Sequence, residues 1–329
     1  MSTALQSYLT ALVFFSRLWT CKAMSSILEG CSHDRLTRLL AGNWCGKTLL
    51  YRVVFQLFDL HEGILLIDDT MIEKPHSKAF DDAFWSWCNT KKTTVFGITI
   101  VFIAWKSKDF LIPLSFRLWR KGGPSKLELT LEMLSEVRNQ LRLKPEFVAF
   151  DSWYSAAKIL KRIDDYGWKY VCRLRANRTF DGVKLRKVRW TPYESRVGFL
   201  NAGLKVRVVR YKKKFFATNR VLSTPKEIRD HYRQRQFIEE LFKRLKSGLG
   251  IHGCQSGHSR SKNAVKISAD SPDSTSSQAH HIALCCLAYV VIEKERQQKV
   301  MSWYKLREKL VHTKAFISMP VLHEVFELA

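Results

Sequence analysis

Four side chains between residues 232 and 246 have the types and the spacing of a group that could act on a phosphate ester. Tyr232, Arg235, Glu239 and Lys246 follow one another at intervals of three, four and seven residues. In an α-helix, where each residue turns the chain by about 100°, all four fall within roughly 60° of one face. An ordinary amphipathic helix with Glu–Arg pairs one turn apart has a similar composition. Catalysis therefore requires partner residues elsewhere in the chain.

Aspartates that directly follow apolar segments are the candidate partners. One apolar run ends in Asp68 and Asp69, and a second ends in Asp151. Carboxylates are uncommon in strands, so an aspartate at the end of a buried strand is often functional, although aspartates also begin turns. Asp69, Asp151 and Glu239 can together bind two divalent ions, which activate an attacking water or 3′-hydroxyl and stabilise the leaving oxygen. Oxygen ligands favour Mg²⁺, with Mn²⁺ as a substitute.

The segments that carry these residues predict an α/β fold, with a mixed sheet flanked by helices. Apolar patterns predict strands at 64–67, 95–105, 110–118, 147–150 and 168–174, and helices at 125–141 and 155–166. Three strands, a helix, a strand, a helix and a strand is the order of the ribonuclease H fold. We therefore expect a ribonuclease H-like core made of residues 61–178 and 219–250.

The remaining regions have different compositions. Residues 1–60 read as helical, either as a small DNA-binding bundle or as a packed layer. Residues 179–218 predict a β-rich insertion. A long helix is expected at 225–249, with Thr224 as its N-cap. Residues 251–280 are low in complexity and predict an exposed loop, and 281–329 predict C-terminal helices.

The charge of the chain points to a polyanionic partner. Lys and Arg number 55 against 30 Asp and Glu, which gives a net charge of +25. Residues 201–250 alone hold 14 basic and 4 acidic side chains. Nucleic acid is the commonest partner of such a surface. The eight cysteines form no C-x-x-C pair, and neither a signal peptide nor a membrane span is evident, so we expect a cytoplasmic protein without a membrane partner.

The string Tyr-x2-Arg-x3-Glu-x6-Lys resembles the signature of the insertion-sequence-four-like DDE transposases of bacteria. The sequence Ile67-Asp68-Asp69-Thr70 is similar to the first-aspartate motif of that family, and the segment from Phe150 to Tyr154 is similar to the second. The resemblance covers roughly residues 60–295. Its Asp-Thr match favours Asp69 as the first ligand, while Asp68 stays a rival because strand neighbours face opposite sides.

The resemblance implies a cut-and-paste DNA transposase acting in the bacterial nucleoid. Cleavage at the transposon ends would proceed through a hairpin before the ends join target DNA, with two protein copies in the DNA complex. Arg235 and Lys246 would hold phosphates, and Tyr232 would contact the backbone. Trp190 would stack on a flipped base, or else is a core tryptophan. The alternatives are a non-catalytic DNA-binding descendant and a ribonuclease H-like nuclease that cannot join strands.

Overall fold

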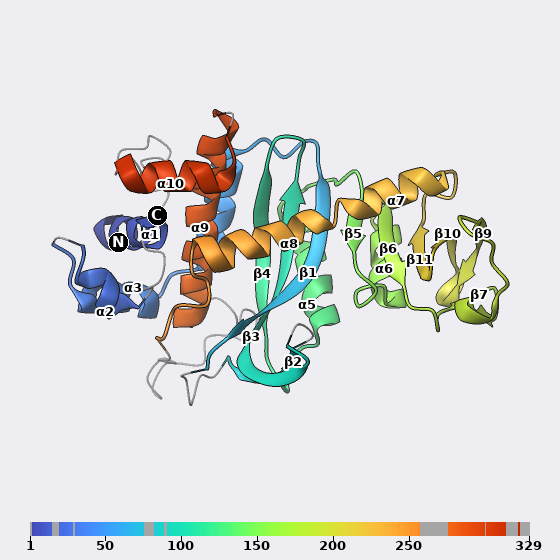
Figure 1. Cartoon of the computed structure of the whole chain (residues 1–329), viewed down its shortest axis with the longest axis horizontal. Coiled ribbons are helices and arrows are strands. Elements are labelled where there is room, and N and C mark those ends of the chain that lie inside the picture. Colours follow the sequence, from blue (N-terminus) through green and yellow to red (C-terminus); the bar gives the residue numbers. More distant parts are fainter. Residues whose placement is uncertain are drawn as a thin grey trace.

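A mixed β-sheet runs through the middle of the molecule and carries helices on both faces (Figure 1). The computed structural model describes residues 2–14, 20–28, 30–75, 82–88, 91–256, 276–299, 301–313 and 322. The first strands are β1 (Ile64–Glu73), β2 (Phe84–Cys88), β3 (Thr93–Lys106), β4 (Leu111–Trp119), β5 (Val148–Phe150) and β6 (Tyr170–Leu174). The predicted order of elements is therefore observed, with β2 as a strand that the sequence patterns did not indicate.

The register of β1 with its two neighbours aligns the candidate carboxylates. β1 is antiparallel to β3 and parallel to β5, with Ile67 beside Phe150. Each of these residues is followed by an aspartate, so Asp68 and Asp151 lie level on adjacent strands. The alternation of side chains along a strand then sends Asp69 to the opposite face from Asp68.

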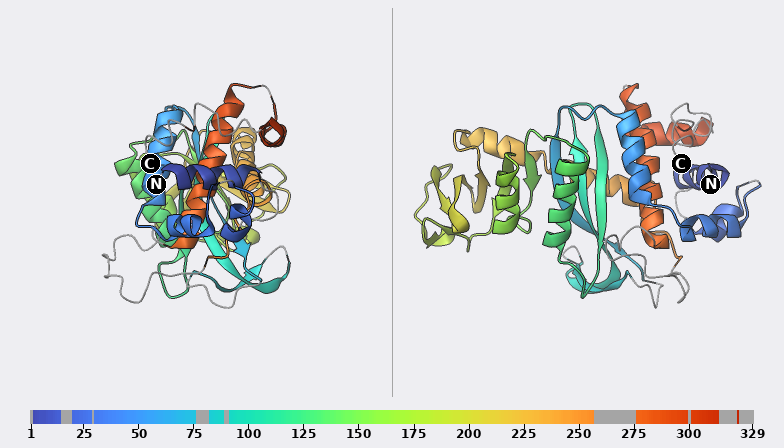
Figure 2. Two further views of the ribbon diagram at one scale, coloured as in Figure 1. Left: turned by 90° about the vertical axis from the view of Figure 1, so that its left-hand side faces the viewer. Right: turned by 180° about the vertical axis from the view of Figure 1, so that it is seen from behind.

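Two pairs of helices cover opposite faces of the sheet (Figures 1 and 2). One face carries α5 (Lys126–Ser135), extended by the π-helical turn η1 (Glu136–Gln140), together with α6 (Ala157–Asp165). The other carries α7 (Pro225–Arg233), α8 (Gln236–Lys243) and the π-helical turn η4 (Arg244–Gly248). The long helix expected at 225–249 is thus interrupted after Arg233 and changes to π geometry in its last turn.

The insertion extends the same sheet from β6 outward. Its elements are β7 (Thr179–Phe180), β8 (Val183–Lys184), the 3-10 turns η2 (Leu185–Lys187) and η3 (Asn201–Gly203), β9 (Ser195–Leu200), β10 (Leu204–Tyr211) and β11 (Lys214–Thr218). β11 pairs with β6, and β10 and β9 follow in order. β8 ends at Lys184, where the chain turns inward at the buried Leu185. β9 was not foreseen.

The N-terminal helices pack on the C-terminal helix α9 (Ser277–Gln297). α1 (Ser2–Phe14), α3 (His33–Ala41) and α4 (Gly46–Leu57) contact α9, as does α10 (Trp303–Thr313), and α2 (Cys21–Ser25) packs on α3. A Cβ atom at Gly46 would lie 2.5 Å from that of Ala283, so only glycine lets α4 approach α9 this closely. The ring nitrogens of His280 lie 2.6 and 2.7 Å from the carbonyl oxygens of Leu40 and Trp44. These contacts pack α3 and α4 against α9.

Part of the stretch 251–280 lies within the described residues. Of the low-complexity stretch, residues 257–275 lie outside the described residues, and Ser277 to His280 already belong to α9. Among the helices that are described, none has the length and apolarity needed to cross a membrane.

A buried histidine joins α9 to α1 and to the segment after η4. The Nδ1 atom of His281 lies 2.8 Å from the hydroxyl of Tyr8, and its Nε2 atom lies 3.1 Å from the carbonyl oxygen of Gly250. Burial, helped by the positive charge of Lys74, lowers the pKa of His281 to about 3. The folded protein therefore holds this imidazole neutral.

We expect His281 to make the protein sensitive to acid. The unfolded chain binds a proton at this residue below its ordinary pKa of 6.5, whereas the folded chain does so only near 3. Stability present above pH 6.5 is therefore lost as the pH falls toward 3, at about 1.4 kcal/mol per pH unit from this group. Urea unfolding between pH 7 and pH 4 should give a shallower pH slope for His281→Gln than for the wild type. The exposed His61 supplies the control, since His61→Gln should keep the wild-type slope; equal slopes for all three proteins would contradict the assignment.

Candidate active site

The guanidinium group of Arg235 joins two of the candidate carboxylates. Its Nη1 atom lies 2.5 Å from Oδ2 of Asp68, and its Nη2 atom forms an ion pair with Oε1 of Glu239. Asp151 lies close enough for its charge to raise the pKa of Arg235, together with those of Asp68 and Glu239 and against the effect of burial. Asp68 and Glu239 therefore contact one cation, and the charge of Asp151 also acts on it.

Local sequence explains how α8 reaches this position. Thr224 caps α7 in a capping box with Glu227, and Pro225 begins the helix. Farther along, Phe242 of α8 packs on Phe102, with ring centroids 5.4 Å apart. Phe102 is the cross-strand partner of Asp68 and shares its face of the sheet. The aromatic contact thus holds α8 over the face to which Asp68 points.

Asp68 has an unusual protonation equilibrium. Its side chain is only 17% exposed. Burial, together with the negative charges of Asp151 and Asp69, raises its pKa to about 7, although Arg235 opposes the shift. Crowded carboxylates shift in this direction because ionising one disfavours ionising the next. Burial and the neighbouring carboxylates therefore disfavour the ionised form of Asp68.

Asp69 belongs to the opposite face of the sheet. Its Oδ2 atom lies 2.6 Å from Nζ of Lys126 at the start of α5, and its Oδ1 atom accepts a hydrogen bond of 2.7 Å from the hydroxyl of Tyr154. Burial and the charges of Asp69, Asp68 and Asp151 raise the pKa of Tyr154, so this hydroxyl keeps its proton. Tyr154 stands in the second-aspartate motif, but no sequence signal singled out Lys126.

Asp151 and Tyr232 complete the group. The backbone N–H of Trp153 donates to Oδ1 of Asp151 over 2.7 Å, which fixes this carboxylate in a tight turn after β5. Tyr232 packs on Phe216, with ring centroids 4.7 Å apart, and the guanidinium of Arg235 lies 6.0 Å from its ring. Burial raises the pKa of Tyr232, and the charge of Asp151 adds to the rise. Tyr232 therefore lies next to Arg235 and is close enough to Asp151 to be affected by its charge.

Lys246 is separated from this group along the helix. It lies in η4, where burial lowers its pKa. The carboxylate whose charge acts on it is that of Glu73, the last residue of β1. The spacing placed all four signature residues on one face. Residues on one helix face are also spread along its axis, so Arg235 lies beside Asp68 whereas Lys246, eleven positions later, lies near Glu73.

Trp190 is a core residue of the insertion. Its side chain is 6% exposed, and its indole N–H donates to the carbonyl oxygen of Leu185 over 3.1 Å. The rings of Phe180 and Phe215 lie 6.1 and 5.6 Å away, and the guanidinium of Arg196 lies 4.9 Å from its ring centroid. Of the two roles left open by the sequence, the structure has the buried one.

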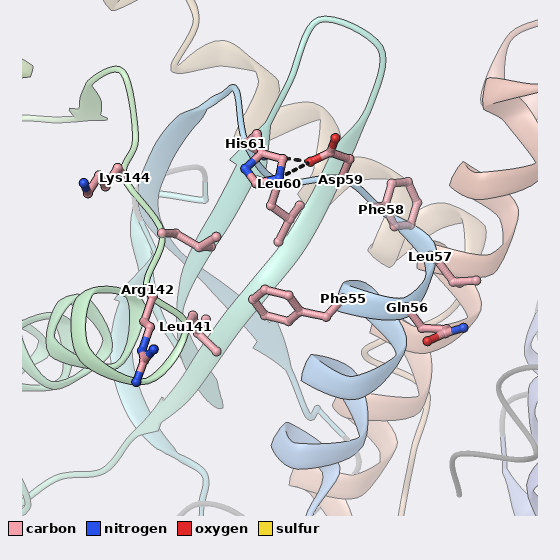
Figure 3. Close-up of a pocket in the computed structure, with 11 residues that line it drawn as sticks. Phe55, Gln56, Leu57, Phe58, Asp59, Leu60, His61, Leu141, Arg142 and Lys144 are labelled. Atoms are coloured by element: carbon pink, nitrogen blue, oxygen red, sulfur yellow. Dashed lines mark hydrogen bonds and ion pairs between the residues drawn. The ribbon is translucent and has the colours of Figure 1, made fainter.

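The donors around β1 suit a hard divalent cation in chemistry, since they are all carboxylate oxygens. Lys126 and Arg235 neutralise part of the negative charge of these carboxylates, and a bound metal ion would neutralise more of it. Within the described part of the chain, no three His, Cys, Asp or Glu side chains converge into a group ready to hold a metal. A pocket of about 650 Å³ lies elsewhere, between residues 55–61 and 141–144 (Figure 3), and includes none of the candidate carboxylates.

The chain matches one protein-family model and resembles a solved structure. A protein-family model described as "Transposase DDE domain" matches residues 59–268, which include β1, β5 and α8. The chain also resembles the cryo-EM structure of the piggyBac transposase synaptic complex with hairpin DNA. That similarity has a TM-score of 0.58 at 13% identity and covers 98% of this chain and 72% of the other. At this identity it shows a shared fold and nothing more. No curated protein sequence matches the chain.

The burial of Trp190 leads to a stability prediction. Trp190→Ala should lower the free energy of unfolding by about 3–5 kcal/mol, because it empties a packed aromatic site. Trp190→Phe keeps most of the ring and should lose only the roughly 1 kcal/mol of the hydrogen bond to Leu185 and some packing. Trp85→Ala is the matched control, since that indole is 69% exposed. Urea unfolding of the three variants tests this, and wild-type stability for Trp190→Ala would show that the indole is not part of the core.

Proposed function

Because the chain belongs to the transposase DDE domain family, we propose that it is a DNA transposase that cuts at transposon ends and joins them to target DNA. The observation that carries this proposal is the contact of one guanidinium, that of Arg235, with both Asp68 and Glu239 beside Asp151. Carboxylates from two neighbouring strands and one helix are thereby available to one reacting phosphate.

The strand order supports a ribonuclease H-like core. Strands β4, β3 and β1 are antiparallel, and β5 and β6 continue parallel to β1 on its other side. In this proposal the core comprises residues 61–178 and 219–250, and residues 179–218 are inserted between its second aspartate and its glutamate. The insertion follows β6 in the chain and returns through β11 to the start of α7.

The catalytic carboxylates in this proposal are Asp68, Asp151 and Glu239. The Asp-Thr match of the sequence favoured Asp69 as the first of them. The shared face of Asp68, Asp151 and α8 favours Asp68, since Asp69 is engaged with Lys126 and Tyr154 on the side of α5. Asp69 would then tune the charge of the site from across the strand.

Transposases of the DDE type generally use divalent metal ions, and we propose Mg²⁺, with Mn²⁺ as a substitute. When bound by Asp68, Asp151 and Glu239, two such ions would activate the attacking oxygen and stabilise the leaving one. The side chain of Glu239, which is 55% exposed, is the most accessible of the three. In this proposal Arg235 breaks part of its ion pairing with the carboxylates and contacts the phosphate to be cut. Tyr232 contacts the neighbouring DNA backbone.

The DNA partners proposed are the transposon ends and the target duplex, held by two copies of the chain. The excess of 25 positive charges supports a nucleic acid partner. A hairpin intermediate is proposed because the structurally similar piggyBac complex contains hairpin DNA. Lys246, near the far end of β1, would contact phosphates away from the cut.

We expect the two adjacent aspartates to differ in their importance for cleavage. Asp68→Asn should slow metal-dependent cleavage of transposon-end DNA by roughly a hundredfold to a thousandfold, the usual cost of removing a group that stabilises transition-state charge. Asp69→Asn should slow it less, because that side chain faces α5. The two variants are compared in single-turnover cleavage assays with Mg²⁺ and with Mn²⁺. A greater loss for Asp69→Asn would return the first ligand to Asp69.

Glu239 and its neighbour Glu240 form a second matched pair. Glu239→Gln should abolish cleavage but keep DNA binding, which should still weaken steeply with salt because it depends on phosphate contacts. Glu240 is similarly exposed but pairs with Arg244, so Glu240→Gln should cut DNA at the wild-type rate. Cleavage that survives in Glu239→Gln would reject the catalytic assignment. Binding without any cleavage by the wild type would favour a non-catalytic DNA-binding protein, and cleavage without joining would favour a nuclease.

A further inference from the structure

The strand β2 presents two indoles to solvent at one end of the sheet. The side chains of Trp85 and Trp87 are 69% and 60% exposed, although large apolar rings that lie together are usually covered. β2 pairs with β3 along one side, and no other strand of the described residues pairs with it. In Figure 1 it lies at the lower end of β3, whereas the insertion lies at the right. β2 is therefore an edge strand with an apolar surface.

The other face of β2 holds the strand in place. Phe84 packs on Trp119 of β4, with ring centroids 4.7 Å apart. The hydroxyl of Ser86 donates to the sulfur of Met71 in β1 over 2.9 Å. Because side chains alternate along a strand, these contacts direct the two tryptophans of β2 to the opposite face. The exposed indoles thus stand on a strand that is fixed by its own packing.

The two tryptophans share the face of the sheet that carries Asp68. Trp85 lies opposite Phe96 of β3, with ring centroids 5.8 Å apart, and Phe102 lies opposite Asp68. Phe96 and Phe102 are six residues apart on one strand, an even number, so their side chains point to the same side. β2 therefore extends the face on which the candidate site lies.

This edge carries no charge on a chain that is strongly basic elsewhere. Residues 83–90 and 93–105 contain no Asp, Glu, Lys or Arg. Between them, Nζ of Lys91 lies 2.6 Å from the carboxylate of Glu73. Nucleic acid would gain no phosphate contact from β2 itself. Two copies of a chain with a net charge of +25 repel each other least where the contact is neutral, and protein interfaces are enriched in tryptophan and poor in charge. The chemistry of this edge therefore fits a second copy of the chain.

The middle of β2 is complementary to itself. The sequence Trp85-Ser86-Trp87 reads the same in both directions. Two antiparallel copies with Ser86 opposite Ser86 place Trp85 of each copy opposite Trp87 of the other. The carbonyl oxygen of Cys88 accepts a hydrogen bond of 2.9 Å from the N–H of Lys92 across the hairpin. Because backbone groups alternate in direction along an antiparallel strand, those of both tryptophans then point outward, toward a new strand.

We propose that two copies of the chain associate through the outer edges of β2, related by a two-fold axis at Ser86. Such an axis is perpendicular to the sheet, so the faces that carry Asp68 in the two copies lie on the same side of one continuous sheet. The use of this dimer rests on the proposed transposase function, since it presents two candidate sites to two transposon ends. The association itself requires no DNA.

The test is sedimentation equilibrium of the full chain without DNA, over a series of protein concentrations. The wild type should follow a monomer–dimer equilibrium. Trp85→Ala and Trp87→Ala should each raise the dissociation constant of the dimer at least about thirtyfold, the effect of removing a tryptophan from the centre of an interface. Each substitution acts twice, because a two-fold contact contains both copies of the residue. Trp153→Ala removes an indole that is 52% exposed elsewhere and should keep the wild-type constant.

Two further measurements control for register and for folding. Ser86→Cys should form a disulfide between two copies under a mild oxidant, because the two-fold axis brings these positions together. Thr94→Cys lies one strand farther from the axis, on β3, and should not. At concentrations where the wild type is a monomer, Trp85→Ala should unfold at the same urea concentration as the wild type, since the indole is exposed in the single chain.

The outcomes separate this inference from the transposase proposal. A wild type that stays monomeric across the whole concentration range would overturn the β2 dimer and leave the catalytic carboxylates as proposed. Assembly that continues beyond the dimer, or a dimer that Ser86→Cys does not cross-link, would overturn the two-fold pairing as well. Weaker DNA binding by Trp85→Ala with unchanged association would identify a DNA contact instead. Failure of the wild type to bind or cut DNA would reject the transposase proposal without altering the sedimentation result.

Discussion

Repulsion among three neighbouring aspartates is the constraint on which the candidate site depends. Asp68 and Asp151 lie level on adjacent parallel strands, and Asp69 directly follows Asp68. Partial burial adds to this repulsion, and the pKa of Asp68 rises to about 7 as a result. The fold compensates with one cation on each face of β1: Arg235 beside Asp68, and Lys126 beside Asp69. Each cation belongs to the helical layer that covers its face, so the charge balance links those layers to the sheet.

These partly buried ion pairs fix the positions of the charged side chains and add little to stability. Bringing charged groups out of water offsets much of their attraction, so an ion pair of this kind adds little to the free energy of unfolding, whereas loss of one partner is costly. Arg235 joins Asp68 to Glu239 one helical turn later, and the packing of Phe242 on Phe102 supplies the apolar contact that keeps α8 there. Electrostatics and packing therefore specify the same position for the helix.

Trp190 and Trp153 lie in opposite environments, one in the core and one at the surface. Trp190 follows the 3-10 turn of the insertion, and its N–H is satisfied by the carbonyl oxygen of Leu185, so the ring is buried between aromatic neighbours. Trp153 follows β5 at the edge of the site, where Asp151 holds its backbone and its ring faces solvent. The position of each turn thus decides which of the two indoles faces solvent.

Local patterns in the sequence determined the order of β1, β3, β4, β5 and β6 with the helices between them, and the start of α7 at Thr224 and Pro225, because these depend on apolar periodicity and capping. Only the tertiary structure decided that Asp68 shares a face with α8, that Lys126 pairs with Asp69, and that Lys246 lies near Glu73. Alternation along a strand requires Asp68 and Asp69 to face opposite sides, but which helix covers each side depends on contacts between residues far apart in the chain.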